Sequence, residues 1–357
     1  MNRVRNRLEV SIGGRMVGEG HSPLIVAEMS GNHNQSFDRA IEIIDKAKAA
    51  GADAIKFQTY TPDTMTLDLK RDEFFLKDMD NPWEGKSLYE VYKEAYTPWE
   101  WHEDLAKRCK DIGLLWFSSP FDASAVDFLE KLNVPAYKIA SAENTDIQLI
   151  RKVAATGKPV IISTGMATIA DLSESVEVAR EAGCKELILL KCTCTYPAAP
   201  ENSNLLTIPH LRDLFNTPVG LSDHTLGIGV GVASVALGSV LVEKHFTLSR
   251  EEGGVDAFFS LEPHELKMLG EECRRAWSSL GGIVYGPVGK EKDYLKCRRS
   301  LYVVKDMEKG ELFSADNVRA IRPGLGLPTK YFDVLRGAKV SRSVKKGTPV
   351  SWEILTI

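Results

Sequence analysis

The chain has 357 residues, of which 43% are hydrophobic and 26% are charged, and its formal net charge is −4 at neutral pH. These values are ordinary for a globular protein with two domains or one large domain, and they argue against a dedicated partner of nucleic acid or anionic membrane. The sequence shows no signal-peptide pattern and no apolar run of about 18 residues, so we expect a cytoplasmic protein.

From residue 24 onward, short apolar segments alternate with amphipathic ones. The apolar segments are rich in bulky and β-branched residues and do not alternate with polar residues, which predicts strands that are buried on both faces. They cover residues 24–28, 54–58, 114–119, 136–141, 159–164, 187–193, 219–223 and 241–245.

Between most of these segments, apolar residues recur at helical spacing. Asn, Asp, Ser or Thr often precedes such a stretch and Gly often follows it, as at helix ends. The clearest stretches cover residues 37–51, 99–113, 124–133, 171–183 and 263–281. Eight strands alternating with about eight helices over roughly 260 residues predict a (β/α)8 barrel. A doubly wound open sheet is the alternative, but it usually has fewer strands and often a Gly-rich first turn.

The alternation ends at Gly281, which divides the chain. Residues 282–296 are rich in glycine and are predicted to form a linker. Residues 297–357 contain short β-like segments and a weak internal repeat, E-K-G-E-L-F-S and K-K-G-T-P-V-S. We therefore expect residues 1–281 to form the barrel and residues 297–357 to form a small, mostly β domain, which at this size is marginal by itself.

The six cysteines form no C-x-x-C pair, so neither a zinc ribbon nor a thioredoxin motif is expected. We expect buried free thiols in a reducing compartment. The cysteines are Cys109, Cys184, Cys192, Cys194, Cys273 and Cys297.

Polar residues at the ends of the predicted strands form a candidate active site, because all strands of such a barrel end at one face. Glu28, Lys56 and Lys138 lie inside apolar segments, where an unpaired charge would be costly. Two lysines with several hydroxyl groups predict a site for anions such as phosphate and carboxylate. Other polar residues at these ends are Asn32, Ser119, Ser141, Glu143, Ser163, Tyr196 and Ser222.

Two neighbouring predicted strands are followed or ended by a histidine, His224 in G-L-S-D-H-T and His245 in L-V-E-K-H. Neutral imidazole groups at adjacent strand ends can share a metal ion. A lysine inside a barrel strand can instead form a Schiff base with a carbonyl substrate. Spacing alone does not separate an imine-forming aldolase from a metal-assisted condensing enzyme, but the two histidines favour the metal.

Nine short motifs occur in order along nearly the whole chain. They are A-E-M-S-G-N-H-N, A-I-K-F-Q-T-Y, F-S-S-P-F-D, Y-K-I-A-S-A-E, I-I-S-T-G-M-A, C-T-C-T-Y-P, G-L-S-D-H-T, E-K-H-F and R-R-S-L-Y. Together they resemble the sialic acid synthase family, whose members have a (β/α)8 barrel followed by an antifreeze-like (SAF) domain.

Three stretches are similar to one branch of that family, the pseudaminic acid branch. They are S-G-N-H-N, T-Y-T-P-D-T-M-T-L-D and S-L-Y-E-V-Y-K-E-A-Y-T-P-W-E-W. The resemblance implies that phosphoenolpyruvate, 2,4-diacetamido-2,4,6-trideoxy-altrose and water react to give pseudaminic acid and phosphate.

The resemblance also implies roles for individual residues. His224 and His245 match ligands of a divalent metal, usually Mn²⁺, with Mg²⁺ or Co²⁺ as alternatives. Glu28 matches an acid/base carboxylate near the reacting carbons. The positions that match the phosphate and carboxylate pocket are Lys56, Ser119, Lys138, Ser141, Ser163 and Ser222. As candidate catalytic residues we take Glu28, Lys56, Lys138 and Glu143.

The sugar side of the site is implied in the same way. Glu143, Tyr196 and Asp256 match sugar contacts, and Asn32 is added as a candidate substrate contact. Arg298 matches an arginine of the SAF domain that reaches the sugar site of the other subunit. The resemblance therefore implies a domain-swapped homodimer. Two positions depart from the neuraminate branch: Cys194 stands where that branch has a polar amide, and Ser119 replaces a threonine.

Three alternatives stay open. An N-acetylneuraminate or legionaminate synthase would share the chemistry and differ in the acceptor sugar. An imine-forming pyruvate lyase would use a lysine as its nucleophile. A non-enzymatic SAF-type binding protein is disfavoured, because a scaffold has little reason to bury Lys56 and Glu28.

Overall fold

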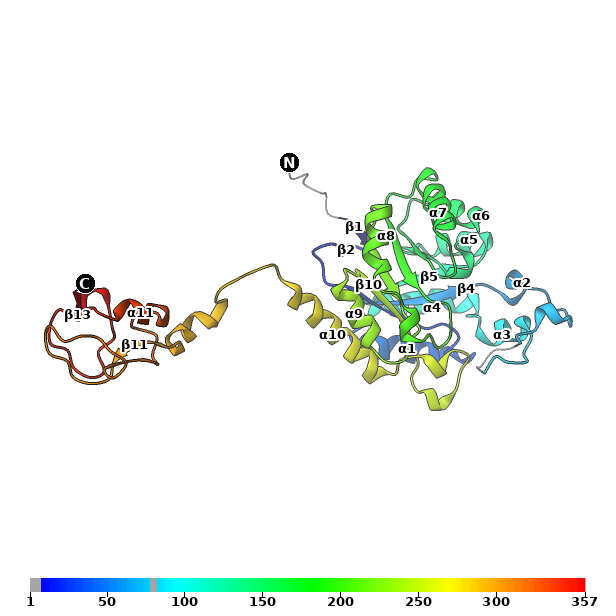
Figure 1. The fold of residues 1–357 in the computed structure, drawn as a ribbon. Coiled ribbons are helices and arrows are strands. Elements are labelled where there is room, and N and C mark those ends of the chain that lie inside the picture. The colour runs from blue at the N-terminus through cyan, green and yellow to red at the C-terminus, as the bar shows by residue number, and fades with distance from the viewer. Residues whose placement is uncertain (1–7, 78–81, 357) are drawn as a thin grey trace. The chain divides into compact units, whose positions relative to one another are not determined.

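The computed structural model describes residues 8–77 and 82–356. The chain divides into two compact units, residues 1–281 and 282–357 (Figure 1). Within the described residues, no helix combines the length and the apolar character that are needed to cross a bilayer.

The first unit contains a closed barrel of eight parallel strands, which confirms the predicted fold and excludes the open sheet. The strands coincide closely with the predicted apolar segments, because a strand buried on both faces needs apolar residues throughout. They are β3 (Leu24–Glu28), β4 (Ala54–Thr59), β5 (Leu115–Pro120), β6 (Tyr137–Ile139), β7 (Val160–Ser163), β8 (Leu187–Cys192), β9 (Val219–Ser222) and β10 (Leu241–His245).

Each strand of the barrel is followed by a helix. Side-chain caps define several helix starts: Ser36 accepts a hydrogen bond from the backbone of Arg39, and Thr168 forms a capping box with Asp171. The helices are α1 (Phe37–Ala49), α4 (His102–Asp111), α5 (Ala123–Lys131), α6 (Ile147–Ala154), α7 (Ile169–Glu181), α8 (Thr207–Phe215), α9 (Gly229–Ala236) and α10 (Pro263–Leu280). Short 3-10 turns in the loops after the strands cover Ser141–Glu143, Pro200–Asn202, Arg250–Glu252 and Ala257–Phe259.

A hairpin that the sequence analysis did not predict precedes the barrel. Strands β1 (Glu9–Ile12) and β2 (Arg15–Gly18) pair in antiparallel fashion. Ile12 is fully buried in the barrel's hydrophobic core, and a guanidinium nitrogen of Arg15 lies 2.7 Å from a carboxylate oxygen of Asp53, directly before β4. The hairpin therefore lies at the amino-terminal end of the barrel and leaves the carboxyl-terminal end for the site.

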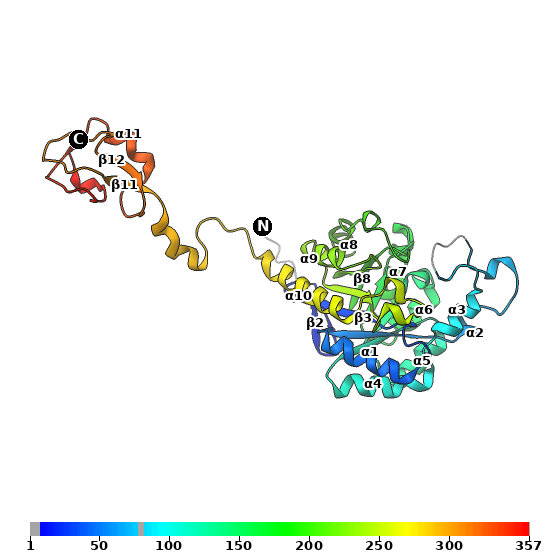
Figure 2. The same ribbon diagram turned by 90° about the horizontal axis from the view of Figure 1, so that it is seen from below.

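The connection between β4 and α4 carries two additional helices, α2 (Pro62–Met65) and α3 (Leu88–Ala95), and 3-10 turns at Asp72–Phe74 and Trp99–Trp101. Figures 1 and 2 both show α2 and α3 projecting from one side of the barrel. Because this connection leaves the carboxyl end of β4, it borders the face at which the polar residues were predicted.

The second unit has its own small hydrophobic core. Strands β11 (Ser300–Val303) and β12 (Val318–Ile321) form one antiparallel pair, and β13 (Lys339–Val340) and β14 (Leu355–Thr356) form another, with α11 (Phe332–Leu335) between β12 and β13. The predicted linker at 282–296 is partly helical, since a 3-10 helix covers Gly289–Cys297. Its start is stabilised by the carboxylate of Glu291, which accepts a hydrogen bond from the backbone of Val288 at 2.9 Å.

Candidate active site

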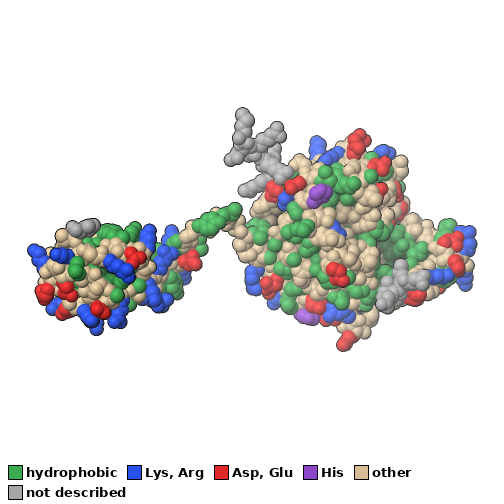
Figure 3. Space-filling model, in the orientation of Figure 1, with side chains coloured by type: hydrophobic (Ala, Val, Ile, Leu, Met, Phe, Trp, Pro, Cys, Tyr) green, Lys and Arg blue, Asp and Glu red, His purple; other side chains and the backbone are tan. Residues whose placement is uncertain are grey.

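A cavity of about 370 Å³ opens at the carboxyl-terminal end of the barrel. Figure 3 shows a hollow between the body of the barrel and the projecting segment with α2 and α3. The cavity brings together residues from seven of the eight strands and, after β5, the loop residue Phe121. The predicted site residues that line it are Glu28, Lys56, Lys138, Ser141, Glu143, Ser163, Tyr196, Ser222, His224, His245 and Asp256.

Three predicted site residues do not line this cavity. Ser119 is buried beside Gln58 in the strand register, and its hydroxyl group has no hydrogen-bond partner among the described residues. The side-chain nitrogen of Asn32 donates to the carbonyl oxygen of Phe246 and the hydroxyl of Ser260, both at 2.9 Å, so Asn32 joins two loops. Arg298 lies in the second unit, directly after the 3-10 helix Gly289–Cys297, and is exposed.

Lys56 and Lys138 share a carboxylate that the sequence analysis missed, Glu243 of β10. Nζ of Lys56 lies 2.6 Å from Oε1 of Glu243 and 3.2 Å from Oε2 of Glu28, and Nζ of Lys138 lies 3.7 Å from Oε1 of Glu243. Burial opposes the charge on Lys56, but Glu243 and Glu28 raise its pKa above the ordinary value. Burial lowers the pKa of Lys138, although Glu243 opposes this shift. The floor of the cavity therefore holds an ionised Lys56–Glu243 pair.

Strand alternation could have identified Glu243. It stands two residues before His245, so both side chains are on the same face of β10, inside the barrel. Lys244, between them, points the other way: its Nζ lies 2.9 Å from a carboxylate oxygen of Asp223 and 2.5 Å from the carbonyl oxygen of Thr225. Lys244 thus fixes the loop that follows β9, which contains His224.

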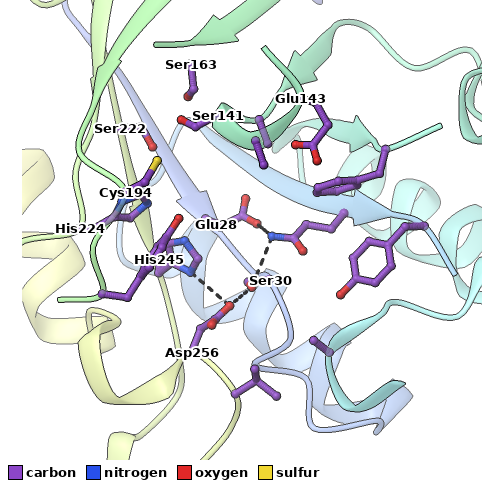
Figure 4. A pocket seen from close by; sticks show the side chains of 18 of the residues that line it. Glu28, Ser30, Ser141, Glu143, Ser163, Cys194, Ser222, His224, His245 and Asp256 are labelled. Atoms are coloured by element: carbon purple, nitrogen blue, oxygen red, sulfur yellow. Dashed lines mark hydrogen bonds and ion pairs between the residues drawn. The ribbon is translucent and has the colours of Figure 1, made fainter. Parts of the chain in front are cut away.

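Two buried carboxyl groups, Glu28 and Asp256, lie next to the histidines (Figure 4). Burial raises the pKa of Glu28 to about 7, although Lys56 opposes the shift. Nε2 of Gln58 donates to Oε1 of Glu28 at 2.8 Å. Burial raises the pKa of Asp256 to about 6, and the hydroxyl group of Ser30 donates to this carboxylate. Both carboxyl groups can therefore change protonation near neutral pH.

His224 and His245 lie side by side, with ring centroids 5.3 Å apart (Figure 4). Nδ1 of His224 is 2.9 Å from the carbonyl oxygen of Thr193, so this nitrogen donates and Nε2 keeps its lone pair in the neutral ring. Nδ1 of His245 has no hydrogen-bond partner among the described residues and lies 3.6 Å from Oδ2 of Asp256. Burial and the neighbouring His224 hold the pKa of His245 well below its ordinary range.

These two imidazole groups could form part of a ligand set for a divalent metal. Over residues 8–77 and 82–356, no three or more His, Cys, Asp or Glu side chains are grouped so that they could hold a metal ion. A buried ring nitrogen of His245 that has no hydrogen-bond partner within the described part of the chain suits a metal, as does the Nε2 lone pair of neutral His224. The residues present therefore fit a metal whose remaining ligands come from substrate and water, as in an open catalytic site.

Cys192 and Cys194 also line the cavity, with their Sγ atoms 3.8 Å apart. All six cysteines are free, as predicted, but Cys194 is only partly buried and Cys297 is exposed. Gly165 packs against this corner: a Cβ atom there would collide with Sγ of Cys194 and Oγ of Ser141. The backbone nitrogen of Gly165 also donates to Oγ of Ser141 at 3.2 Å.

The cavity has an apolar side as well as a polar floor. Met65 of α2 and four residues of α3 contribute to it, and we call these five residues the α3 wall. They are Met65, Leu88, Val91, Tyr92 and Ala95. These residues were not predicted from the sequence, because they follow no strand end and their helical spacing is equally typical of core packing.

Glu143 gives a testable pH dependence. Its Oε2 atom is buried without a hydrogen-bond partner among the described residues, and burial raises its pKa from 4.5 to about 7. Its contribution to the free energy of unfolding is therefore fully present below pH 4.5 and is lost as the pH rises through about 7. We predict that Glu143→Gln, which stays neutral, changes stability little at pH 4.5 and raises the free energy of unfolding by about 3 kcal/mol at pH 8.

Urea unfolding at the two pH values measures this difference. Glu174→Gln on the exposed face of α7 is the matched control for the substitution itself. A gain for Glu143→Gln that is equal at both pH values would contradict the prediction, because it would come from packing and not from ionisation.

Comparisons with known proteins agree with this architecture. The NeuB family model matches residues 43–285, and the SAF domain model matches residues 298–356. Pseudaminic acid synthase of Campylobacter jejuni subsp. jejuni serotype O:2 is 44% identical over 90% of this chain and 94% of its own length. N,N'-diacetyllegionaminic acid synthase of the same organism is 35% identical over 90% of this chain and 97% of its own length.

A solved structure supports the same assignment. The N-acetylneuraminic acid (sialic acid) synthetase of Leptospira borgpetersenii serovar Hardjo-bovis is 30% identical, with a TM-score of 0.71 over 82% of this chain and 96% of that chain. The motifs that resembled the sialic acid synthase family thus lie in a chain that matches that family in sequence and in fold. The chain belongs to the NeuB family, and its barrel is followed by a SAF domain.

Proposed function

We propose that this chain is a pseudaminic acid synthase, which condenses phosphoenolpyruvate with 2,4-diacetamido-2,4,6-trideoxy-altrose and water to give pseudaminic acid and phosphate. One observation decides the acceptor sugar. Campylobacter jejuni has synthases for both pseudaminic and legionaminic acid, and this chain is 44% identical to the first and 35% identical to the second. The cavity supports the chemistry, because it combines buried cations with carboxyl groups that titrate near neutral pH.

Phosphoenolpyruvate would bind at the floor of the barrel, to Lys56, Lys138 and the serines at the strand ends. The buried hydroxyl group of Ser163, which lines the cavity, has no hydrogen-bond partner among the described residues, and neither has that of Ser119, which lies outside the cavity lining. A buried hydroxyl group without a partner is costly unless a ligand supplies one. Lys56 keeps its proton beside Glu243, so it can donate charge-assisted hydrogen bonds to phosphate or carboxylate. Ser141 and Ser222 complete this set.

Glu28 would be the acid/base group, since a carboxyl group with a pKa of about 7 can hold or release a proton at neutral pH. As C3 of phosphoenolpyruvate attacks the sugar aldehyde, protonated Glu28 can donate to the aldehyde oxygen. Water then adds to the oxocarbenium-like C2, and ionised Glu28 can accept a proton from it before phosphate leaves. Glu143, Tyr196 and Asp256 would hold the sugar.

His224 and His245 would hold a divalent metal, which we propose to be Mn²⁺. When bound there, the metal would supply Lewis-acid polarisation of the open-chain aldehyde. The support for this role is the pair of adjacent imidazole rings with available nitrogen atoms.

An imine-forming pyruvate lyase is a second candidate, because burial lowers the pKa of Lys138 and a neutral amine is a nucleophile. Lys56 suits that reaction less, since its carboxylate neighbours raise its pKa. Borohydride reduction in the presence of pyruvate separates the two candidates. A lyase would leave a covalent lysine adduct in the mass spectrum, and the proposed synthase leaves none.

Phosphate release from phosphoenolpyruvate with a panel of acceptors tests the proposed function. The panel contains 2,4-diacetamido-2,4,6-trideoxy-altrose, the acceptor of legionaminic acid synthases and N-acetylmannosamine. We expect the altrose derivative to give the highest kcat/KM, because the acetamido group at C4 and the stereochemistry of the sugar offer polar contacts that the site can distinguish. Equal turnover of N-acetylmannosamine would refute the assignment to pseudaminic acid.

Chelation tests the metal. EDTA should abolish phosphate release and Mn²⁺ should restore it, because a metal held by His224 and His245 would polarise the aldehyde. His224→Ala should lose Mn²⁺ binding in equilibrium dialysis, whereas His210→Ala, at an exposed position of α8, should retain it. Full activity of the chelated enzyme would exclude this role.

We also propose that the SAF domain completes the active site of a second subunit in a homodimer. Arg298 is exposed within its own unit, and its planar guanidinium group can hold an amide carbonyl or hydroxyl groups with fixed geometry. Arg298→Ala should raise KM for the sugar more than KM for phosphoenolpyruvate, and Arg342→Ala, also exposed in that unit, is the control.

Subunit mixing tests the contribution across the dimer. A chain with Arg298→Ala and a chain with Glu28→Ala should each have little activity, and exchange of subunits should restore part of it. Mixed dimers that form but stay inactive would show that the arginine acts within its own chain or contacts no sugar.

A further inference from the structure

Helix α3 directs its apolar face into a cavity. Leu88, Val91, Tyr92 and Ala95 follow one another at spacings of three, one and three residues, which places them on one side of the helix, and all four line the cavity. The intervening charged residues, such as Glu94, are exposed. An apolar helix face normally packs against a core. Here it contributes to a pocket whose opposite contributors are polar strand ends, so its partner is expected to be a ligand with an apolar part.

The structure holds α3 firmly in this position. Ser87 and Glu90 form a capping box at its start, with the backbone nitrogen of Ser87 donating to Oε2 of Glu90 at 2.9 Å. The hydroxyl group of Tyr89 donates to a carboxylate oxygen of Asp63 in α2 at 3.2 Å. At the other end of the helix, Ala95 packs closely on Gly31. A Cβ atom on residue 31 would lie 2.8 Å from Cα of Ala95. The wall is therefore a fixed surface.

We propose that the α3 wall binds the C6 methyl group of the acceptor sugar and so selects 6-deoxy sugars. This inference rests on the proposed function. The aldehyde carbon C1 must lie at the polar floor, near Glu28 and the histidines. C6 is the carbon farthest from C1 in the open chain, so it has to leave the floor. Leu88, Val91, Ala95 and Met65 offer hydrocarbon and thioether surface, which suits a methyl group and gives an added hydroxyl group no side-chain hydrogen bond, so the hydroxyl group of Tyr92 is the polar side-chain group of the wall.

The expected selectivity is moderate. A pocket that merely lacks a hydrogen-bond partner rejects an added hydroxyl group by roughly a hundredfold at most. The wild-type enzyme should therefore prefer a C6 methyl group over a C6 hydroxymethyl group within that range. Replacing a wall residue by a side chain of the same shape that carries a hydroxyl group should reduce this preference. The new hydroxyl group can form a hydrogen bond with the C6 hydroxyl group of the sugar, and it makes the wall less favourable for the methyl group.

The test compares Val91→Thr with Val178→Thr. Both valines are 8% exposed and lie in helices, but Val178 of α7 belongs to the barrel's hydrophobic core and does not line the cavity. The acceptors are 2,4-diacetamido-2,4,6-trideoxy-altrose and the same sugar with a hydroxyl group at C6. Val91→Thr should lower kcat/KM for the 6-deoxy acceptor about tenfold, leave that for the 6-hydroxy acceptor unchanged or higher, and leave KM for phosphoenolpyruvate unchanged. Val178→Thr should keep the wild-type ratio.

If Val91→Thr lowers the melting temperature, the same measurement is made with Leu88→Thr. Leu88 is on the same face of α3 and is only partly buried. Tyr92→Phe removes a hydroxyl group from the wall and should keep or increase the preference for the methyl group. A wild-type preference that both threonine variants retain would overturn the inference and leave the proposed function intact. A wild-type enzyme that turns over neither altrose acceptor would instead refute the proposed function, and this inference with it.

Discussion

The carboxylate of Glu243 keeps two lysine ammonium groups inside the barrel, and the active site depends on this interaction. The side chains of Lys56 and Lys138 are 6% and 2% exposed, and without a carboxylate partner such groups would lose their protons or destabilise the fold. While Glu28 is protonated, one carboxylate shared by two lysines leaves positive charge available for an anion. Oε1 of Glu243 also accepts a hydrogen bond from the hydroxyl group of Ser222 at 3.2 Å. Glu243 therefore links Ser222 with the two lysines before a ligand binds.

Two parts of the molecule with different construction meet in the cavity. The floor consists of strand ends whose positions are fixed by the hydrogen-bonded register of a closed barrel. The α3 wall belongs to a single connection between β4 and α4, which can change in sequence without disturbing that register. The residues proposed for the reaction therefore belong to the barrel strands and their ends, whereas the residues proposed to bind C6 of the acceptor belong to the connection between β4 and α4.

Sequence alone predicted the barrel because strands buried on both faces are continuous apolar segments, and Lys56 and Glu28 stood out within them. Glu243 also lies within such an apolar segment and was not predicted. Helix α9, with the sequence G-V-G-V-A-S-V-A, has no polar face by which to recognise it. The α3 wall could not be assigned, because an apolar helix face looks the same whether it covers a core or a cavity.

The close packing of Gly165 limits the order in which this pocket can change during evolution. A side chain at position 165 would collide with Cys194 and Ser141, so it becomes tolerable only after those side chains have shortened or moved. The three positions therefore constrain one another, because a side chain at position 165 needs the room that Cys194 and Ser141 occupy.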